Sequence, residues 1–507
     1  NRVVRGRKIG DCIFFQGGTA YNDSVAAAFA AVCGKEIVVP PYNGVIGALG
    51  AALLARDKML FGPGKSDASG EGDGGKRIGQ YIPVGADDDQ PAERRQPASR
   101  FRGYDLSRVD YALREFTCKG CSNTCQIQEF NVEGEKTYWG DKCSERFRKQ
   151  SKAAREPVIE DLLSLRSRLL LDEAALPRPG AAAPTVGIPL TMFAYGMLPF
   201  WRTAIAHLGY RTVLSDPTNK KIVQDSLDSV VAEPCFPIIA VHGHVANLAA
   251  KGVDHILLPN IISMETPWMH TESHLCPWHQ TLPFVIRQAP QLKHLAGKFW
   301  TPTMHFRQGR QCVARELAAF FKPLGHSRKQ VADAVAAGFA AQDAFTDKIY
   351  AAGSKALGQI VETGQTAIVL VGRPYNLHDT GMNLSVGQKL RDYYGVNVIP
   401  QDFLKLDDYD VRDVNSSMYW NLGHKMLAAA KLVGEHPNLH IIYITNFKCG
   451  PDSFIKHFIL RASGKPFLTL QFDSHANDAG MMTRCEAYLD SKGILRPWRR
   501  EAMAVEA

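Results

Sequence analysis

An apolar, β-branched run that stops at a cysteine constrains this chain more than any other feature. Residues 442–446 are typical of a buried strand, and Cys449-Gly450-Pro451 ends the run. We expect Asp452 or Ser453 to cap a helix that follows. This places a thiol where open α/β sheets bind ligands. Such a thiol either ligates a metal cluster or packs as a small apolar side chain.

Strands and helices alternate in two series. In the first series we expect strands at 186–190, 211–215, 229–232 and 255–260. In the second we expect strands at 367–372, 396–400, 440–445 and 467–471, after a helical connector at 317–357. Such alternation predicts an α/β fold class with two doubly wound parallel-sheet units. The first unit is expected at 156–316, and the connector with the second unit at 317–507.

Two further cysteines fall in positions similar to that of Cys449. Cys235 follows the expected strand at 229–232, and Cys276 lies in a loop rich in His and Trp after a strand expected at 256–262. The three thiols come from two units, so they meet only if the units close on each other. We expect the sulfurs of one cluster to lie roughly 6–7 Å apart, given metal–thiolate bonds near ~2.3 Å. With three protein ligands, one iron would keep an open position.

Four more cysteines form a separate group. Cys118, Cys121 and Cys125 lie within eight residues, and Cys143 returns after an expected hairpin. Four thiolates suit either tetrahedral zinc or an iron–sulfur cluster, and both stay open. We expect a four-cysteine metal module at 101–155. The other cysteines are expected to pack in apolar surroundings: Cys12, Cys33, Cys312 and Cys485.

The N-terminal segment, residues 1–61, contains short strand and helix patterns. Gly17 and Gly18 separate a strand from a helix, and such a turn can admit a nucleotide because it exposes backbone N–H groups. A tight turn without a ligand explains the same two glycines equally well. Residues 62–100 are rich in Gly, Asp, Ser, Pro and Arg and lack apolar periodicity, which predicts a flexible linker.

The composition excludes several classes of protein. A length of 507 residues predicts about three or four domains, and the net charge of +8 is scattered, which argues against a nucleic-acid surface. We find no signal peptide and no apolar run long enough to span a membrane, so we expect a cytoplasmic protein. Eleven cysteines then favour metal or redox chemistry over disulfides. The chain begins with Asn inside an expected domain; we expect a fragment, with a natural short form as the alternative.

Two sets of motifs resemble one protein family. Residues 15–22 and 39–55 are similar to the end of the ATPase domain of 2-hydroxyacyl-CoA dehydratase activators, also called CoA-substrate-specific enzyme activases. The second set resembles the dehydratase-like region fused to large activators, which is related to double-cubane cluster proteins. Its motifs include Ser215-Asp-Pro, Glu233-Pro-Cys-Phe-Pro, His242-Gly-His, Gly372-Arg-Pro-Tyr-Asn and Cys449-Gly-Pro-Asp-Ser-Phe.

The resemblance implies a division of labour along the chain. Residues 1–61 would be the C-terminal remnant of an actin/Hsp70-type ATPase domain, with Gly17 and Gly18 beside the adenosine. The phosphate-binding loops are absent from this sequence, so we expect ATP with magnesium to bind only when the missing N-terminal part is supplied. Cys235, Cys276 and Cys449 would hold an iron–sulfur cluster, of the 4Fe–4S or double-cubane type.

The function implied by the resemblance is electron transfer in anaerobic metabolism. ATP hydrolysis in the activator part would drive low-potential electrons to a cluster that reduces or dehydrates a substrate such as a 2-hydroxyacyl-CoA. The expected partners are the missing ATPase part or a separate activator, a donor such as ferredoxin or flavodoxin, and a second copy of the chain. The sequence identifies no catalytic acid or base. Two alternatives stay open: a non-catalytic iron–sulfur storage or scaffold protein, and a zinc-stabilised binding module.

Overall fold

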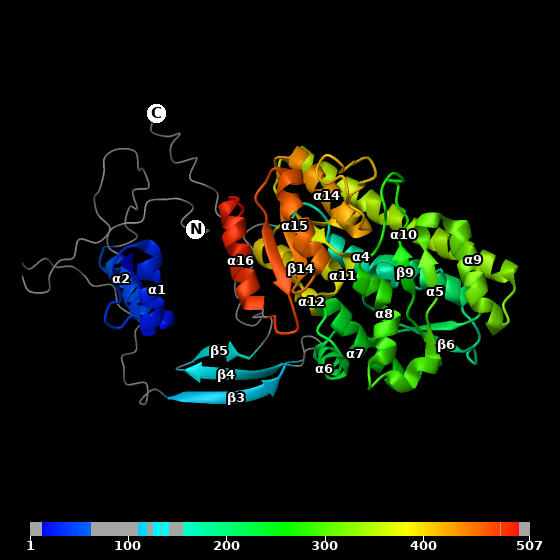
Figure 1. Ribbon diagram of the computed structural model, residues 1–507, viewed down its shortest axis with the longest axis horizontal. Coiled ribbons are helices and arrows are strands. Elements are labelled where there is room, and N and C mark those ends of the chain that lie inside the picture. The colour runs from blue at the N-terminus through cyan, green and yellow to red at the C-terminus, as the bar shows by residue number, and fades with distance from the viewer. Residues whose placement is uncertain are drawn as a thin grey trace, which may run out of the picture. The chain divides into compact units, whose positions relative to one another are not determined.

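The computed structural model divides the chain into two compact units, residues 1–109 and 110–507 (Figure 1). It describes residues 13–61, 110–118, 125–132, 134–140, 156–476 and 478–495. Across these ranges, no helix is long and apolar enough to cross a membrane.

The larger unit contains two four-stranded parallel sheets with the same strand order. The first consists of β10 (Phe299–Trp300), β8 (His255–Leu257), β6 (Thr185–Ile188) and β7 (Arg211–Leu214), in that spatial order. The second consists of β13 (Asn397–Pro400), β12 (Ala367–Gly372), β14 (Leu439–Asn446) and β15 (Leu468–Phe472). In each sheet the first strand along the chain lies inside, so the order reverses beside it. Ligands bind at such a reversal, near the carboxyl ends of the strands.

Helices connect and cover these strands. They are α4 (Leu162–Leu171), α5 (Ala194–His207), α6 (Lys220–Ser229), α7 (Phe236–Ala250), α8 (Pro277–Gln288), α9 (Arg310–Phe321), α10 (Arg328–Thr363), α11 (Pro374–His378), α12 (Thr380–Asn383), α13 (Val386–Tyr394), α14 (Asn421–Glu435), α15 (Gly450–Ser463) and α16 (Asp478–Ser491). Two further strands, β9 (Asn260–Ser263) and β11 (Thr303–His305), pair in parallel and form a separate two-stranded sheet. The predicted α/β fold class is confirmed.

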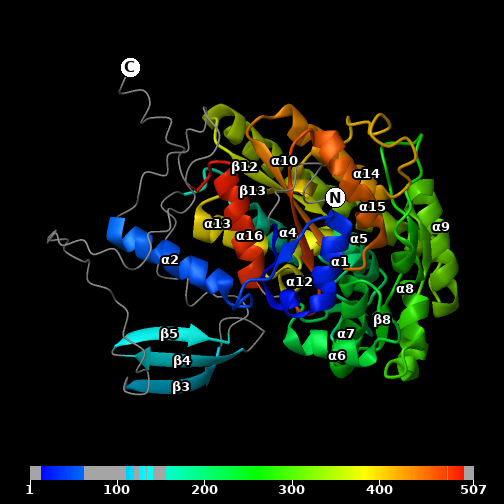
Figure 2. The same ribbon diagram turned by 60° about the vertical axis from the view of Figure 1, so that its left-hand side comes forward.

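The second sheet is buried on both faces because its side chains alternate. Ile368 and Ile442 belong to a cluster with residues of α13 and α16, which lie side by side (Figure 2). Val369, Ile441 and Tyr443 face the opposite way, into a larger cluster that includes α14 and α15. Period-two alternation between two apolar layers explains why the strands are mostly apolar on both faces.

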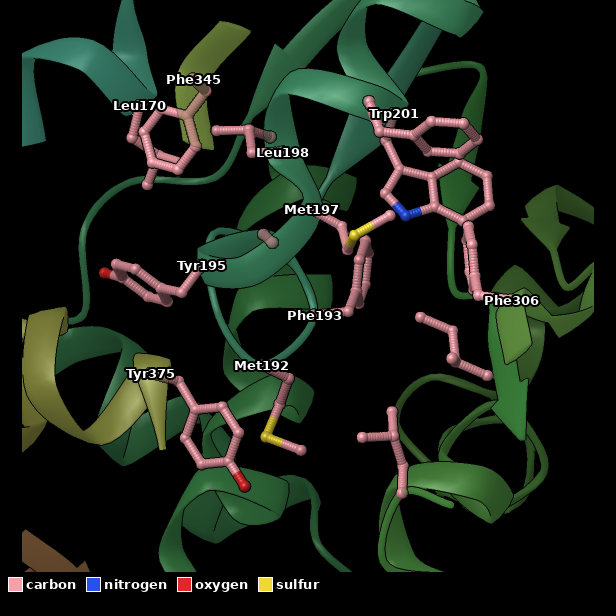
Figure 3. Packing of buried hydrophobic residues seen from close by; sticks show 14 of the residues in the cluster. Leu170, Met192, Phe193, Tyr195, Met197, Leu198, Trp201, Phe306, Phe345 and Tyr375 are labelled. Atoms are coloured by element: carbon pink, nitrogen blue, oxygen red, sulfur yellow. The ribbon is translucent and has the colours of Figure 1, made fainter. Parts of the chain in front are cut away.

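One hydrophobic core runs through both sheets. The larger cluster combines residues of β6 and α5 with residues of α10 and β12, and Figure 3 shows part of it around Trp201, Phe306 and Tyr375. Helix α10 begins at a capping box, in which Ser327 and Gln330 bond each other's backbone N–H groups. The two α/β units therefore pack as a single body rather than as separate lobes.

The expected strand at 229–232 is wrong. Helix α6 continues to Ser229 and ends with the N–H of Val230 bonded to the Ser226 carbonyl. The helix has an amphipathic pattern that buries Ile222 and Ser226, and residues 230–232, which follow it, form no strand. Cys235 consequently does not follow a strand, in contrast to the prediction.

The described part of the smaller unit is β1 (Ile13–Phe14), η1 (Gly18–Tyr21), α1 (Asp23–Cys33), β2 (Ile37–Val38) and α2 (Ile46–Phe61). Strands β1 and β2 pair in parallel, yet α1 buries none of its residues. Residues 110–140 contribute an antiparallel sheet of β3 (Tyr111–Thr117), β4 (Gln126–Val132) and β5 (Glu135–Trp139). This sheet contains the hairpin expected in the four-cysteine module.

Candidate functional site

Cys235, Cys276 and Cys449 occupy the same position in three different helices. Each is the N-cap residue, in extended conformation, of α7, α8 and α15 respectively. Each helix also has a proline at its first or second position, where a missing N–H removes no helical bond. None of the three side chains makes a capping hydrogen bond. The helix positive ends therefore point toward thiols, a setting that favours thiolates.

The topology places these helix starts at one edge. Helix α7 leads into β8, so its N-terminus lies toward the carboxyl ends of the first sheet, and α15 begins four residues after β14 ends. An exposed ion pair between Lys448 and Glu233 connects the residue before Cys449 with the loop before Cys235. Lys448 adopts a left-handed backbone with φ of 64°. The loops before Cys235 and Cys449 are thus in contact through this pair, while the distance between the sulfurs stays a prediction.

The loop before Cys276 contacts both α/β units. Bridges connect His274 with Ser263 on one side and with Trp420 on the other. The N–H of His274 donates to the Tyr419 carbonyl at 2.8 Å, and the N–H of Asn421 donates to the His274 carbonyl at 3.0 Å. The loop before Cys276 is therefore clamped between β9 and the start of α14.

A buried ion pair lies beside the thiols. Arg373, directly after β12, donates from Nε and Nη2 to Oδ1 of Asp452, at 3.1 and 2.8 Å. Thr445 donates to the other carboxylate oxygen at 2.6 Å. Arg373 is 2 % exposed and Asp452 is 1 % exposed. The expected cap of α15, Asp452, instead holds the guanidinium that follows the neighbouring strand.

Burial and mutual charge keep two of the thiols protonated. Burial raises the pKa of Cys235 to about 12, with a further contribution from Cys276, while Arg373 opposes the shift. Burial likewise raises the pKa of Cys449 to about 12; Asp452 and Cys235 add to it and Arg373 lowers it. These thiols therefore feel each other's charge, and thiolates form there only with a compensating cation.

A small apolar cavity of about 50 Å³ is lined by Leu275, the residue before Cys276. It is lined from both α/β units, by Ile261 and by His279 of α8 as well as by Met192 and Tyr375, which Figure 3 labels. Burial, and then the charge of Arg373, lower the pKa of His279 to about 3, so its imidazole is neutral.

Tyr375 is the polar donor of this cavity. Burial raises the pKa of Tyr375 well above its ordinary value; Arg373 opposes this, and all three thiols of the site reinforce it. Its phenol therefore keeps its proton. Among the described residues, Nε2 of His279 has no hydrogen-bond partner. The cavity thus offers a phenol donor and an unpaired imidazole nitrogen in otherwise apolar surroundings.

The described residues were also compared with the ligand groups that bind a single metal ion. Within the described ranges, no group of three or more His, Cys, Asp or Glu side chains is arranged to hold one metal ion. Four ligands of one zinc ion would bring sulfurs to within about 4 Å of each other, from Zn–S bonds of ~2.3 Å. The predicted cluster separation of the three sulfurs is larger and stays a prediction.

The four-cysteine module is described in part. The N–H of Cys118 donates to the Cys125 carbonyl at 2.7 Å, directly beyond the Thr117–Gln126 pair of the hairpin. Gly140, with φ of 97°, approaches Gln126 so closely that a Cβ atom would meet its carbonyl oxygen at 2.4 Å. The β5 strand therefore returns to the Cys118–Cys125 end. Cys121 and Cys143 lie outside the described residues, so the shared metal site stays a prediction.

The Gly17-Gly18 turn requires glycine at its first position. Gly17 has a φ of 96°, which L side chains rarely adopt, and its N–H donates to the Asn43 carbonyl at 2.8 Å. Side-chain atoms added at either glycine would meet nothing within 4 Å. The turn explains the choice of Gly17 by itself, and adenosine binding stays a prediction.

Sequence reasoning missed the residues between the thiols. Arg373, Tyr375 and His279 were not assigned a role, although the Gly372-Arg-Pro-Tyr-Asn motif after a strand was a signal for the first two. Cys312 and Cys485 are buried within α9 and α16, as expected. The core position expected for Cys33 is wrong, because this thiol is only half-buried on α1, which buries none of its residues. Cys12 lies outside the described residues.

Comparison with known proteins identifies one domain. No curated protein matches the chain. Residues 185–404 match the family model described as the CoA enzyme activase uncharacterised domain. The match covers β6 through β13, including Cys235, Cys276 and Arg373, and ends before Cys449. It supports the CoA enzyme activase family and points to an activator-type function on CoA enzymes.

Proposed function

We propose that this chain is the iron–sulfur part of an ATP-dependent activator–dehydratase system, with its cluster held by Cys235, Cys276 and Cys449. The observation that carries the proposal is that three thiols from two α/β units occupy the N-caps of three helices and that their charges act on one another. Thiolate donors suit iron–sulfur clusters. A bound cluster supplies one-electron chemistry at a potential set by hydrogen bonds and burial.

The chain's own residues hold and tune the site. The backbone N–H groups of Ile238 and Asp452, three residues into their helices, favour the charged forms of Cys235 and Cys449. The buried guanidinium of Arg373 adds positive charge that limits the repulsion among thiolates.

The cavity is the proposed position of the reacting group. Tyr375 keeps its phenol proton and can donate to a substrate oxygen, while the neutral His279 accepts or donates at Nε2. A volume of about 50 Å³ admits only a small reacting end, so a thioester substrate such as an acyl-CoA would keep its larger part outside. The proposed partners are a CoA-dependent enzyme or substrate, an ATPase activator part and a ferredoxin- or flavodoxin-type donor.

The test is anaerobic purification of the full chain with iron and sulfide analysis and EPR. Cys235→Ser, Cys276→Ser and Cys449→Ser should each remove the same amount of iron and the same signal. Cys312→Ser is the matched control, because this buried thiol packs within α9 and should leave the iron content unchanged. Zinc in place of iron, or small and unequal losses in the three variants, would contradict the proposal.

A further inference from the structure

A second groove lies between α4, α5 and α10. Its volume is about 360 Å³, within the range of small-molecule sites. One wall is an alanine stripe of α10, formed by Ala337, Ala340, Ala341 and Ala344. These residues recur at helical spacing and leave an open apolar trough.

A buried arginine lies in the wall of this groove. Arg202 on α5 is 3 % exposed, and its Nη2 donates to Oε1 of Glu173. Among the described residues, its Nε and Nη1 have no hydrogen-bond partner. Unpaired guanidinium N–H groups away from water are unfavourable, so the site calls for a further acceptor.

The only acceptor supplied by described residues is easily replaced. The side chain of Glu173 is 70 % exposed, whereas that of Arg202 is 4 % exposed. Exposed ion-pair partners add little stability. Two further basic side chains line the groove, His207 and Lys348, against one acidic side chain, Asp172. The groove therefore combines an apolar wall with a lining that has more basic than acidic side chains, and its buried arginine already binds a carboxylate.

We propose that this groove binds an aliphatic carboxylate, with the carboxylate on Arg202 and the chain along the alanine stripe of α10. A ligand carboxylate can accept a charge-assisted hydrogen bond from Nη2 of Arg202, the atom that now donates to Glu173. The bound carboxylate replaces Glu173 as the acceptor of the hydrogen bond from Arg202. In the absence of a ligand, Glu173 accepts this bond. The site is separate from the three thiols, so it stands or falls independently of the iron–sulfur proposal.

The experiment measures binding of octanoate to the full chain by calorimetry. Octanol supplies the aliphatic chain without the charge, and acetate supplies the carboxylate without the chain. Glu173→Gln removes the competing carboxylate and should tighten octanoate binding; Glu362→Gln, an exposed glutamate of α10 outside the groove, is the matched control. Ala341→Leu fills the groove without touching Arg202 and should abolish binding.

Arg202→Met should weaken octanoate binding by about tenfold or more, because a charge-assisted hydrogen bond contributes at least that factor. If this variant fails to fold, Glu173→Gln and Ala341→Leu still decide the question. Octanol binding as tightly as octanoate, an unchanged affinity in Glu173→Gln, or only ordered water against Arg202 in octanoate-soaked crystals would overturn the proposal.

Discussion

Breaking the Arg373–Asp452 pair should destabilise the larger unit strongly. Asp452→Asn leaves the guanidinium of Arg373 buried without the carboxylate that accepts two of its N–H groups. Removing one partner of a buried ion pair costs about 3–5 kcal/mol, far more than the pair itself contributes. Arg373→Met leaves Asp452 bonded to Thr445 alone and should cost a similar amount. Equilibrium unfolding in guanidinium chloride measures both changes in the free energy of unfolding.

The double variant is the decisive measurement. Because neither charge is left buried in Arg373→Met/Asp452→Asn, its loss of stability should be well below the sum of the two single losses. The exposed pair of Arg412 and Asp410 is the matched control, since Arg412→Met should leave the unfolding midpoint unchanged within error. Additive losses in the double variant, or single losses as small as that of the control, would refute the reasoning.

Three further predictions concern metal, pH and nucleotide. Changing Cys118, Cys121, Cys125 or Cys143 to Ser should remove the same quantity of bound metal each time; small independent losses in elemental analysis would exclude one shared site. Burial raises the pKa of Asp379 to about 7, against hydrogen bonds from Thr218, Met382 and Gly381. The folded state therefore binds the extra proton, and stability should fall as pH rises from about 4 to 7, by up to about 1.4 kcal/mol per pH unit. Asp379→Asn should remove this part of the slope in unfolding measurements at a series of pH values, and a slope unchanged from wild type would contradict it. The chain alone should show little or no ATP binding in equilibrium dialysis, and strong ATPase activity would show that residues 1–61 are misread.

The sheets were predictable because their strands are apolar on both faces. Strands β12, β14 and β15 begin and end within a residue or two of the expected positions. The expected strand at 229–232 failed because two valines after an amphipathic helix carry a strand signal too short to separate from a loop. Which residues lie near the thiols follows from tertiary packing. The pairing of Arg373 with Asp452 spans 79 residues, and no local pattern encodes it.

The N-cap of α15 is a second case in which local sequence preferences predicted the element but not its first residue. The sequence predicted that Asp452 or Ser453 would cap α15, since both are good N-cap residues. The structure begins the helix earlier, at Cys449, and uses Asp452 for Arg373. A side chain with a strong buried partner is not available for capping. The competing ion pair could be recognised only after β12 and β14 were known to be neighbours.

A cysteine at an N-cap is an unfavourable choice for stability, and this gives a last prediction. Serine at an N-cap accepts a hydrogen bond from the helix and typically contributes about 1 kcal/mol, whereas the thiol of Cys449 makes no such bond. Cys449 is only half-buried, so its replacement by serine buries little additional polar surface. In metal-free protein, Cys449→Ser should therefore raise the free energy of unfolding by about 0.5–1 kcal/mol.

The control separates capping from general effects of the substitution. Cys312→Ser changes a buried thiol inside α9 and should lower stability, because the hydroxyl gains no capping role there. If Cys449→Ser has a lower free energy of unfolding than the metal-free wild type, the inference that the N-cap thiol lowers stability is wrong. If it is more stable yet binds less iron, the chain keeps cysteine at this helix start for ligation and at the expense of its own stability. Proteins make such exchanges at functional sites, where stability is given up for chemistry that a better cap cannot perform.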